Sequence, residues 1–484
     1  MDRNLIIRGI RDIIVKGVRN RDITSVEIPD GVTEIGEGAF ANCTSLQSVI
    51  IPESVVEIGK NAFEGCSSLQ SLIIPIYVEK IGEKAFYGCS SLNSISIPDG
   101  MVKIEECAFQ NCSSLTSINI PNSIKKIYKS TFSGCSSLKS ITIPNSVIEI
   151  EDSVFSGCKS LESVNIPKDI KKINYGTFSY CKALKVLDIP HGVIDIGGSA
   201  FENCYSILTI TIPDSVTTIG NGAFAGCHSL KSITIPNSVN QVFSRAFQGC
   251  IALRKVEFTA NAKIICSSTF NGCMTLQSII IPDGVTKIED SAFYGCLSLK
   301  SVNIPSSVSI IEKRAFSDCS SLKSINLPER LMNIENETFI KCKSLESISI
   351  PASVSKIGER AFKGCVSLLS ASIPEGVKSI EESAFEECKS LQSITFPKSM
   401  AEIGVCAFLG CVSLKTVIFP ISEYTFVFKS GGGSSIKYLS ETTIEDRAFF
   451  GCSSLRNVVI PDNVFYYTRV FESTTSIRRK KNIF

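Results

Sequence analysis

Apolar and polar positions recur along this chain with a period of 23 residues. A typical copy reads IPNSVIEIEDSVFSGCKSLESVNIP, from Ile143 to Pro167. Proline marks the period most clearly, because all 18 prolines occupy one repeat position, and between Pro29 and Pro420 only Thr259 interrupts the series. A fixed period of this length indicates a solenoid, in which each coil buries its apolar edge against its neighbours.

The segment before each proline predicts a β-strand. In LQSVIIP (46–52), Val49 and Ile51 alternate with residues that point outward, which is the period of a strand with one buried face. Proline lacks the backbone donor that a strand ladder needs, so it ends the strand. Stacked copies of this strand predict a long parallel sheet.

The rest of each copy predicts a bent extended piece followed by a single helical turn, and no second regular strand. In SVVEIGKNAFEGC (54–66), the apolar residues recur at spacings of three and four rather than two. The residue before each repeat cysteine is glycine in eleven copies, such as Gly65, and Asn or Asp in four more, such as Asn42. These residue types tolerate a left-handed backbone, so the turn is expected to end there.

The repeats also set the expected domain boundaries. Residues 1–22 have an apolar spacing that suits a capping helix, and residues 23–420 form a solenoid of about 17 repeats. Residues 421–440 read as an inserted loop of Gly, Ser and aromatic residues, and 441–463 as the last full repeat. Residues 464–484 lack the repeat cysteine, which indicates a degenerate coil with Arg478–Lys481 as a solvated basic tail.

Composition excludes several functional classes. The net charge is only +2, from 49 basic and 47 acidic side chains, so no strong field favours nucleic acid or a membrane surface. No stretch approaches the roughly 18 to 20 apolar residues of a membrane helix. Charged residues also interrupt the apolar start of the chain, so it lacks the core of a signal peptide.

The repeat columns resemble the BspA-like leucine-rich repeats, whose 23-residue unit reads LxxIxIPxxVxxIGxxAFxGCxSL. The match runs from about Ile23 to Asn463, which is most of the chain. The resemblance implies a curved, right-handed, β-rich solenoid with a parallel sheet on the concave side and short extended or helical pieces on the convex side. It also implies a cell-surface or secreted antigen or adhesin that binds host matrix proteins or neighbouring cells.

Eighteen of the 21 cysteines occupy one repeat column. Stacking places successive column cysteines about 5 Å apart, but their parallel side chains give poor disulfide geometry. We therefore expect a column of buried free thiols that act as small hydrophobic residues. Cys107 and Cys406 share a column expected to face solvent, where they are either reactive thiols or unselected drift.

The sequence gives no case for an enzyme, a metal or a cofactor. One cysteine per repeat and two histidines in the whole chain provide no metal-ligand spacing. The histidines, His191 and His228, lie in loop columns of different repeats, away from any nucleophile. The segment SGGGSS (430–435) lacks the lysine and helix of a phosphate-binding loop.

Departures from the repeat are the candidate partner-binding residues. Around Thr259 the small polar face is replaced by Arg254, Lys255 and Glu257. The insertion either anchors a partner through its aromatic residues or is a tolerated excursion. Isoleucines that break the polar strand column, and the aromatic residues of the insertion, are Ile50, Ile73, Ile280, Ile418, Tyr424, Phe426, Phe428 and Tyr438.

These observations predict a monomeric, non-catalytic scaffold that binds proteins, with the surface adhesin as the leading hypothesis. An intracellular structural or regulatory scaffold is the alternative, favoured by the missing export signal and by thiols that are safest in a reducing compartment. A third hypothesis is a hydroxyl-rich face for glycans or ice. The scarcity of aromatic residues argues against glycans, and charged interruptions such as Asp188 argue against ice.

Overall fold

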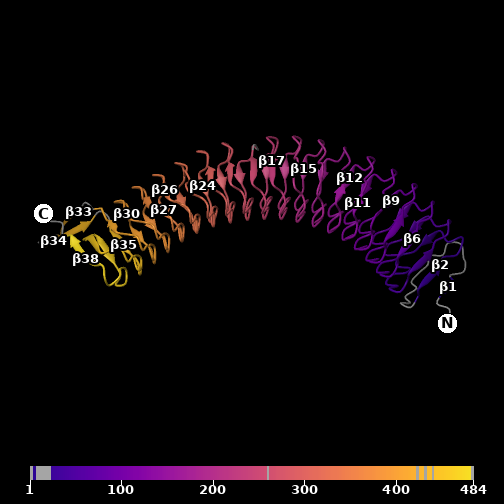
Figure 1. Ribbon diagram of the computed structural model, residues 1–484, viewed down its shortest axis with the longest axis horizontal. Coiled ribbons are helices and arrows are strands. Elements are labelled where there is room, and N and C mark those ends of the chain that lie inside the picture. The colour runs from indigo at the N-terminus through magenta and orange to yellow at the C-terminus, as the bar shows by residue number, and fades with distance from the viewer. Residues whose placement is uncertain are drawn as a thin grey trace. The chain divides into compact units, whose positions relative to one another are not determined.

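The computed structural model describes residues 4–6, 23–258, 261–420, 424–429, 433–438 and 441–480. The chain divides into two units, Met1–Ile251 and Ala252–Phe484. In each unit the chain winds through successive coils that stack side by side (Figure 1). Two kinds of short strand recur along both units. We call the strand before the repeat proline the face strand and the strand after it the flank strand. The fold is therefore a parallel β-solenoid, as the repeat pattern predicts.

The face strands carry the alternating pattern of the sequence. In the first unit they are β1 (Asn4–Ile6), β2 (Ser25–Glu27), β4 (Ser48–Ile50), β6 (Ser71–Ile73), β8 (Ser94–Ser96), β11 (Ser140–Ile141), β13 (Ser163–Val164) and β17 (Ser232–Ile235). In the second unit they are β19 (Lys255–Phe258), β21 (Ser278–Ile280), β23 (Ser301–Asn303), β26 (Ser347–Ser349), β28 (Ser370–Ser372), β30 (Ser393–Thr395), β32 (Thr416–Ile418), β36 (Asn457–Pro461) and β38 (Ser476–Lys480).

The face strands pair in parallel at a step of one repeat, so equivalent residues lie opposite one another. Ser25 pairs with Ser48, and Val26 pairs with Val49. The central residue of each triplet is buried and its two neighbours are exposed, as in β4. The predicted sheet with one buried face is therefore confirmed.

A second set of strands, on the flank of each coil, corrects the expectation of a single strand per repeat. Glu57 pairs with Lys80 and Ile58 with Ile81, with the isoleucines fully buried. Only two residues take part in most flank strands, too few for a period of two to stand out in the sequence. The flank strands of the first unit are β3 (Glu34–Ile35), β5 (Glu57–Ile58), β7 (Lys80–Ile81), β9 (Lys103–Ile104), β10 (Lys126–Ile127), β12 (Glu149–Ile150), β14 (Lys172–Ile173), β15 (Asp195–Ile196), β16 (Thr218–Ile219) and β18 (Gln241–Val242).

In the second unit the flank strands end in a longer run. They are β20 (Ile264–Ile265), β22 (Lys287–Ile288), β24 (Ile310–Ile311), β25 (Asn333–Ile334), β27 (Lys356–Ile357), β29 (Ser379–Ile380), β31 (Glu402–Ile403), β35 (Thr442–Ile444) and β37 (Val464–Tyr466). The strands from β25 to β37 form one six-stranded sheet. This sheet stays continuous across the insertion because Ile403 pairs directly with Ile444.

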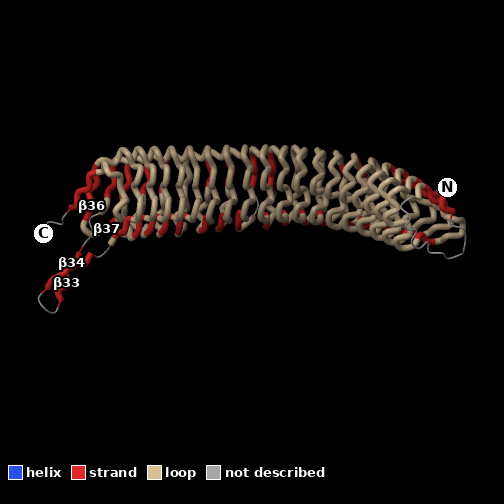
Figure 2. Tube along the Cα trace, turned by 90° about the horizontal axis from the view of Figure 1, so that it is seen from below, coloured by secondary structure: helices blue, strands red, loops and turns tan. Residues whose placement is uncertain are grey.

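The AFxGC segment forms turns rather than the expected helical turn, and Figure 2 shows no helix in the described part of the chain. The Cys43 N–H donates to the Phe40 carbonyl at 3.2 Å, whereas the Phe40 N–H donates to Ala62 of the next coil at 2.7 Å. Bonding to the next coil replaces the bonds that would propagate a helix. The predicted left-handed residue is confirmed at Asn42 and Gly65, and a second left-handed position in the same turn, such as Lys84, was not predicted.

The core is a column of phenylalanines that continues from coil to coil. Phe63 stacks on Phe86 with ring centroids 5.4 Å apart, and Phe224 on Phe247 at 5.5 Å. These distances exceed the roughly 4.8 Å between paired strands, so the coils fan out on the phenylalanine side. Within each unit the face sheet therefore lies on the concave side, as expected.

The cysteine column packs beside the phenylalanines. All 21 cysteines are free, and the 18 of the repeat column are buried. The Cys66 thiol donates to the Phe40 carbonyl of the preceding coil at 3.1 Å, and burial raises the pKa of this thiol to about 12. The expected column of buried thiols is confirmed, and the structure adds a hydrogen bond that ties each coil to the one before it.

Because stacking and not disulfide bonding holds the coils, reducing agent is expected to leave the melting temperature unchanged. Circular dichroism melts of the protein prepared with and without dithiothreitol test this expectation. A large fall in melting temperature on reduction, with bridges mapped between column cysteines by mass spectrometry, would contradict it.

Both ends differ from the sequence expectation. Asn4–Ile6, inside the expected capping helix, forms β1 paired in parallel with β2, while residues 7–22 lie outside the described residues. At the other end, Phe471 stacks on Phe449 at 5.4 Å, so the degenerate coil continues the phenylalanine column. The expected solvated tail is instead the strand β38 as far as Lys480, paired with β36.

The basic residues of β38 also contact the last coil. Arg479 donates from Nη1 to the Val464 carbonyl at 3.2 Å, and its guanidinium lies 5.2 Å from the Tyr466 ring centroid. A charged edge strand of this kind discourages further strand addition. Arg479 therefore ties β38 to the coil that contains Val464 and Tyr466.

Candidate binding face

The exposed side of the face sheet in the first unit is built from small polar side chains. Ser48, Ser71, Ser94, Ser140 and Ser163 occupy one exposed column, and each is the first residue of its strand. The next outward column holds Ser, Thr or Asn in most coils, and this produces a smooth surface rich in hydroxyl and amide groups.

Two asparagines in this second column change the local geometry of the sheet. The Asn165 side-chain amide donates to the Ile143 carbonyl at 2.8 Å, and its Oδ1 accepts from the Ile143 N–H at 2.9 Å. Asn119 makes the same pair of bonds to Ile97, at 2.9 and 3.2 Å. Each amide thus occupies backbone groups that a strand ladder would otherwise use, and residues 117–119 are not assigned as a strand.

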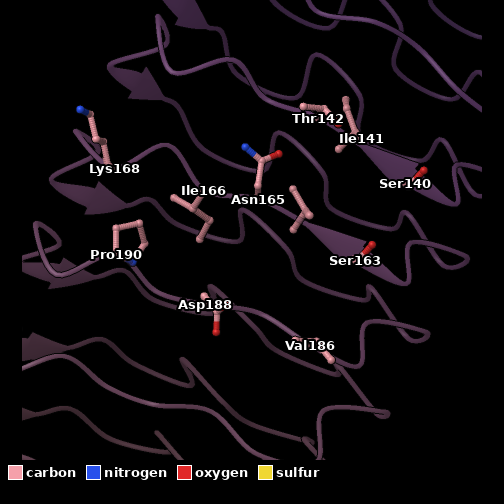
Figure 3. Close-up of a pocket in the computed structure, with 11 residues that line it drawn as sticks. Ser140, Ile141, Thr142, Ser163, Asn165, Ile166, Lys168, Val186, Asp188 and Pro190 are labelled. Atoms are coloured by element: carbon pink, nitrogen blue, oxygen red, sulfur yellow. The ribbon is translucent and has the colours of Figure 1, made fainter.

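The sheet opens into shallow hollows around these two asparagines. One, of about 660 Å³, lies over three successive coils and is lined by residues between Ser140 and Pro190. Figure 3 shows the Asn165 amide directed towards the coil of Thr142. On the other side, only the isolated bridge between Ser163 and Val186 joins the strands. Two neighbouring hollows, of about 540 and 500 Å³, share lining residues with each other and extend towards Ile73.

The largest hollow combines three kinds of chemistry. Hydroxyl groups come from Ser140, Thr142 and Ser163, and opposite charges come from Lys168 and Asp188. Val186, 64% exposed, supplies an apolar contact. Such a surface can hydrogen-bond an extended backbone and hold one apolar side chain.

Sequence reasoning did not select this hollow, although a signal for it was present. Val186 breaks the serine column and Asp188 breaks the small polar column, the same kind of departure that drew attention to Arg254–Glu257. The contribution of Asn165 had no such signal, because an asparagine in this column resembles its small polar neighbours until its bonds to Ile143 are known.

The structure places the residues near Thr259 on the face strand β19 of the second unit. Lys255 and Glu257 form an ion pair at 2.5 Å, so they partly neutralise each other. Arg254 is exposed next to them, and Phe258 is buried edge-on against Phe270. Thr259 itself lies outside the described residues.

The four isoleucines are exposed as expected, two in each unit. Ile50 and Ile73 lie in neighbouring coils of the first unit, where they are 62% and 80% exposed. Ile280 and Ile418, at 71% and 49%, belong to coils of the second unit that are several repeats apart.

The insertion forms a β-hairpin where the sequence suggested a loop. Strands β33 (Tyr424–Lys429) and β34 (Gly433–Tyr438) pair antiparallel in a two-stranded sheet of their own (Figure 2). Tyr424 pairs with Tyr438 and Phe426 with Ile436. Tyr424, Phe426 and Phe428 belong to β33, and Tyr438 is the last residue of β34.

The two cysteines of the turn column are half-buried and lie in the left-handed region, at φ 56° and 57°. Burial raises the pKa of both the Cys107 and the Cys406 thiol above the ordinary value. A raised pKa lowers the fraction of thiolate at neutral pH, which disfavours reactive-thiol chemistry. Among the described residues, no group of three or more His, Cys, Asp or Glu side chains has metal-binding geometry.

In the described residues no helix is long and apolar enough to span a bilayer. The family model for the BspA type leucine rich repeat region (6 copies) matches in overlapping windows that together run from residue 18 to residue 478. No curated protein is significantly similar to the chain in sequence.

Solved structures of bacterial repeat proteins resemble the chain. A leucine-rich repeat protein from Bacteroides ovatus is 32% identical, with a TM-score of 0.55, over 85% of this chain and 92% of that one. A leucine rich cell surface protein from Faecalibacterium prausnitzii is also 32% identical, with a TM-score of 0.47, over 63% of this chain and 87% of that one. Sequence columns, coil geometry and family model agree, and the chain belongs to the BspA-type leucine-rich repeat family.

Proposed function

We propose that this chain is a non-catalytic scaffold that binds protein partners across the face sheet of its first unit, and that it acts as a surface antigen or adhesin. The observation that carries the proposal is the set of hollows around Asn119 and Asn165, where the sheet opens and exposes polar groups. Members of repeat families commonly bind along such extended surfaces.

The composition of the face favours many weak contacts with an extended polypeptide segment. Hydroxyl and amide groups of successive coils can bond to partner backbone, while Val186 and Ile73 offer apolar contacts near the two ends of the hollows. Tryptophan is absent from the chain, and the hollows contain no aromatic or arginine anchor. Affinity would therefore come from contacts summed along the array.

Filling the largest hollow tests the proposal. The double variant Thr142→Arg/Asp188→Arg is expected to abolish adhesion to an immobilised extracellular-matrix extract, because both side chains are exposed and project over the hollow. The control Asn221→Arg, on the turn side of its coil, should adhere like the parent. Melting temperatures should be the same for all three proteins, and undiminished adhesion of the double variant would contradict the proposal.

The same adhesion assay tests the role of the hairpin, and a labelling experiment tests the cellular location. If deletion of Tyr424–Ser440 abolishes adhesion without lowering the melting temperature, the aromatic residues of the insertion are a further anchor. A lowered melting temperature indicates packing on the solenoid. Labelling intact source cells with a membrane-impermeant reagent separates a surface protein from an intracellular scaffold.

A further inference from the structure

A column of exposed residues precedes the flank strands of the first unit, on a different sheet from the proposed binding face. Their backbones form a regular ladder: the Glu79 N–H donates to Val56 at 2.9 Å and the Val102 N–H to Glu79 at 2.7 Å. Ile148 donates to Lys125, and Ile194 to Lys171, with the same spacing. We call this column the flank stripe; its members are Val56, Glu79, Val102, Lys125, Ile148, Lys171 and Ile194.

Aliphatic and charged residues alternate along the flank stripe. Val56, Val102, Ile148 and Ile194 are 46%, 64%, 63% and 48% exposed, one in every second coil. Glu79, Lys125 and Lys171 lie in the coils between and are also exposed. Each central aliphatic residue, Val102 or Ile148, therefore has a longer charged side chain in the coil on either side, and we call the position of each aliphatic residue a socket.

The charged residues of the flank stripe are available for contacts outside the chain. Lysines of the neighbouring flank strands are engaged, as Lys80 is with Glu57 at 2.7 Å and Lys126 with Glu151 at 2.6 Å. In the part of the chain that the structure describes, no ion pair involves Glu79, Lys125 or Lys171. Their charged ends can therefore bond to a partner that lies along the stripe.

The spacing of the sockets indicates which backbone conformation the partner has. Hydrogen-bonded coils lie about 4.8 Å apart, so sockets recur about every 9.6 Å along the stripe. A polyproline II helix repeats every three residues, or about 9.3 Å, and stays in register over four sockets to within about 1 Å. An α-helix repeats a heptad position every 10.5 Å or so and drifts by about 3 Å over the same length. A β-strand presents one face about every 6.7 Å and does not match.

We infer that the flank stripe binds a proline-rich segment in the polyproline II conformation, with an aliphatic residue at every third position. The aliphatic residues would pack on Val56, Val102, Ile148 and Ile194. Polyproline II has no internal hydrogen bonds, so its carbonyls can accept from the ammonium groups of Lys125 and Lys171. A preformed helix also loses little conformational entropy when it binds.

Fluorescence anisotropy with a labelled peptide (Pro-Pro-Leu)4 and the full chain tests this inference. The comparison peptide has the same composition but leucine spacings of two and four residues. The (Pro-Pro-Leu)4 peptide is expected to bind at least about tenfold more tightly, because only its leucines reach the sockets in register. Equal affinity for the two peptides, or no binding of either, would overturn the inference.

Variants locate the site on the chain. Val102→Ser/Ile148→Ser should weaken binding of (Pro-Pro-Leu)4 by roughly tenfold or more, since two apolar contacts are lost. Val412→Ser is the control, because Val412 is also an exposed aliphatic residue but lies in a turn of the second unit. Equal weakening by Val412→Ser, or no effect of the double variant, would refute the flank stripe as the site. The adhesion of the face variants tests only the proposed function. Its result does not change the inference about the flank stripe, which rests on peptide binding.

Discussion

Replacing Phe224 with alanine is expected to lower the free energy of unfolding by about 3 to 5 kcal/mol, because it opens a cavity in the continuous aromatic column. The ring is fully buried and stacks on Phe201 at 5.3 Å and on Phe247 at 5.5 Å. The substitution therefore removes contacts on both sides. In a solenoid each coil touches only its neighbours, so the loss weakens two interfaces at once.

Urea unfolding followed by circular dichroism measures this effect. Phe243→Ala is the matched control, since Phe243 lies in the same unit but is 37% exposed. The control is expected to cost about 1 kcal/mol, because much less apolar area leaves water there on folding. Equal destabilisation by the two substitutions would mean that the phenylalanine column does not dominate the core.

Alkaline pH is expected to destabilise the protein steeply, because the buried thiols cannot ionise in the folded state. Desolvation raises the pKa of Cys135, Cys250 and Cys296 from 9.0 to about 12. Below pH 9 both states keep the proton, so the stabilisation is fully present. Between pH 9 and 12 only the unfolded chain releases protons, and stability falls by about 1.4 kcal/mol per pH unit for each such thiol.

Comparison of unfolding midpoints at pH 8 and pH 10, under reducing conditions, tests this prediction. The variant Cys135→Ala/Cys250→Ala should lose less stability over this range than the parent. Above pH 9 the difference in the free energy of unfolding should equal the contribution of two thiols, each about 1.4 kcal/mol per pH unit. Ionisation of lysine and tyrosine is common to both proteins and cancels in the comparison. Identical pH dependence in parent and variant would show that the column thiols do not control alkaline unfolding.

Much of the fold was predictable from the sequence because each repeat has the same residue types at the same positions. Val49 and the proline at position 52 define a face strand, and repetition at 23 residues makes the strands stack in register. The buried thiols followed from the same argument, and their free state is confirmed. These features depend on residue type at a fixed position, which a single sequence displays directly.

Features that depend on bonds between coils were not predictable in the same way. The turn after Phe40 is held by the Ala62 carbonyl of the next coil, so its local sequence suggested a helix that does not form. The flank strand at Glu57–Ile58 exists only because Glu34–Ile35 and Lys80–Ile81 lie on either side of it. Residues 424–429 and 433–438 pair with each other as two antiparallel strands, which a loop-like composition did not reveal.

The candidate binding face also combines features that the sequence predicts with features that it does not. By itself the sequence determined which side chains leave the repeat pattern, including Ile73, Lys255 and Asp188, because a departure is visible in one column. Only the tertiary structure decided which of these departures lie next to one another. The Asn165 amide bonds to Ile143 and the sheet opens beside it, whereas Lys255 pairs with Glu257. The physical reason is that a hollow and an ion pair are properties of neighbouring side chains in space, and a 23-residue period fixes their coil but not their partners.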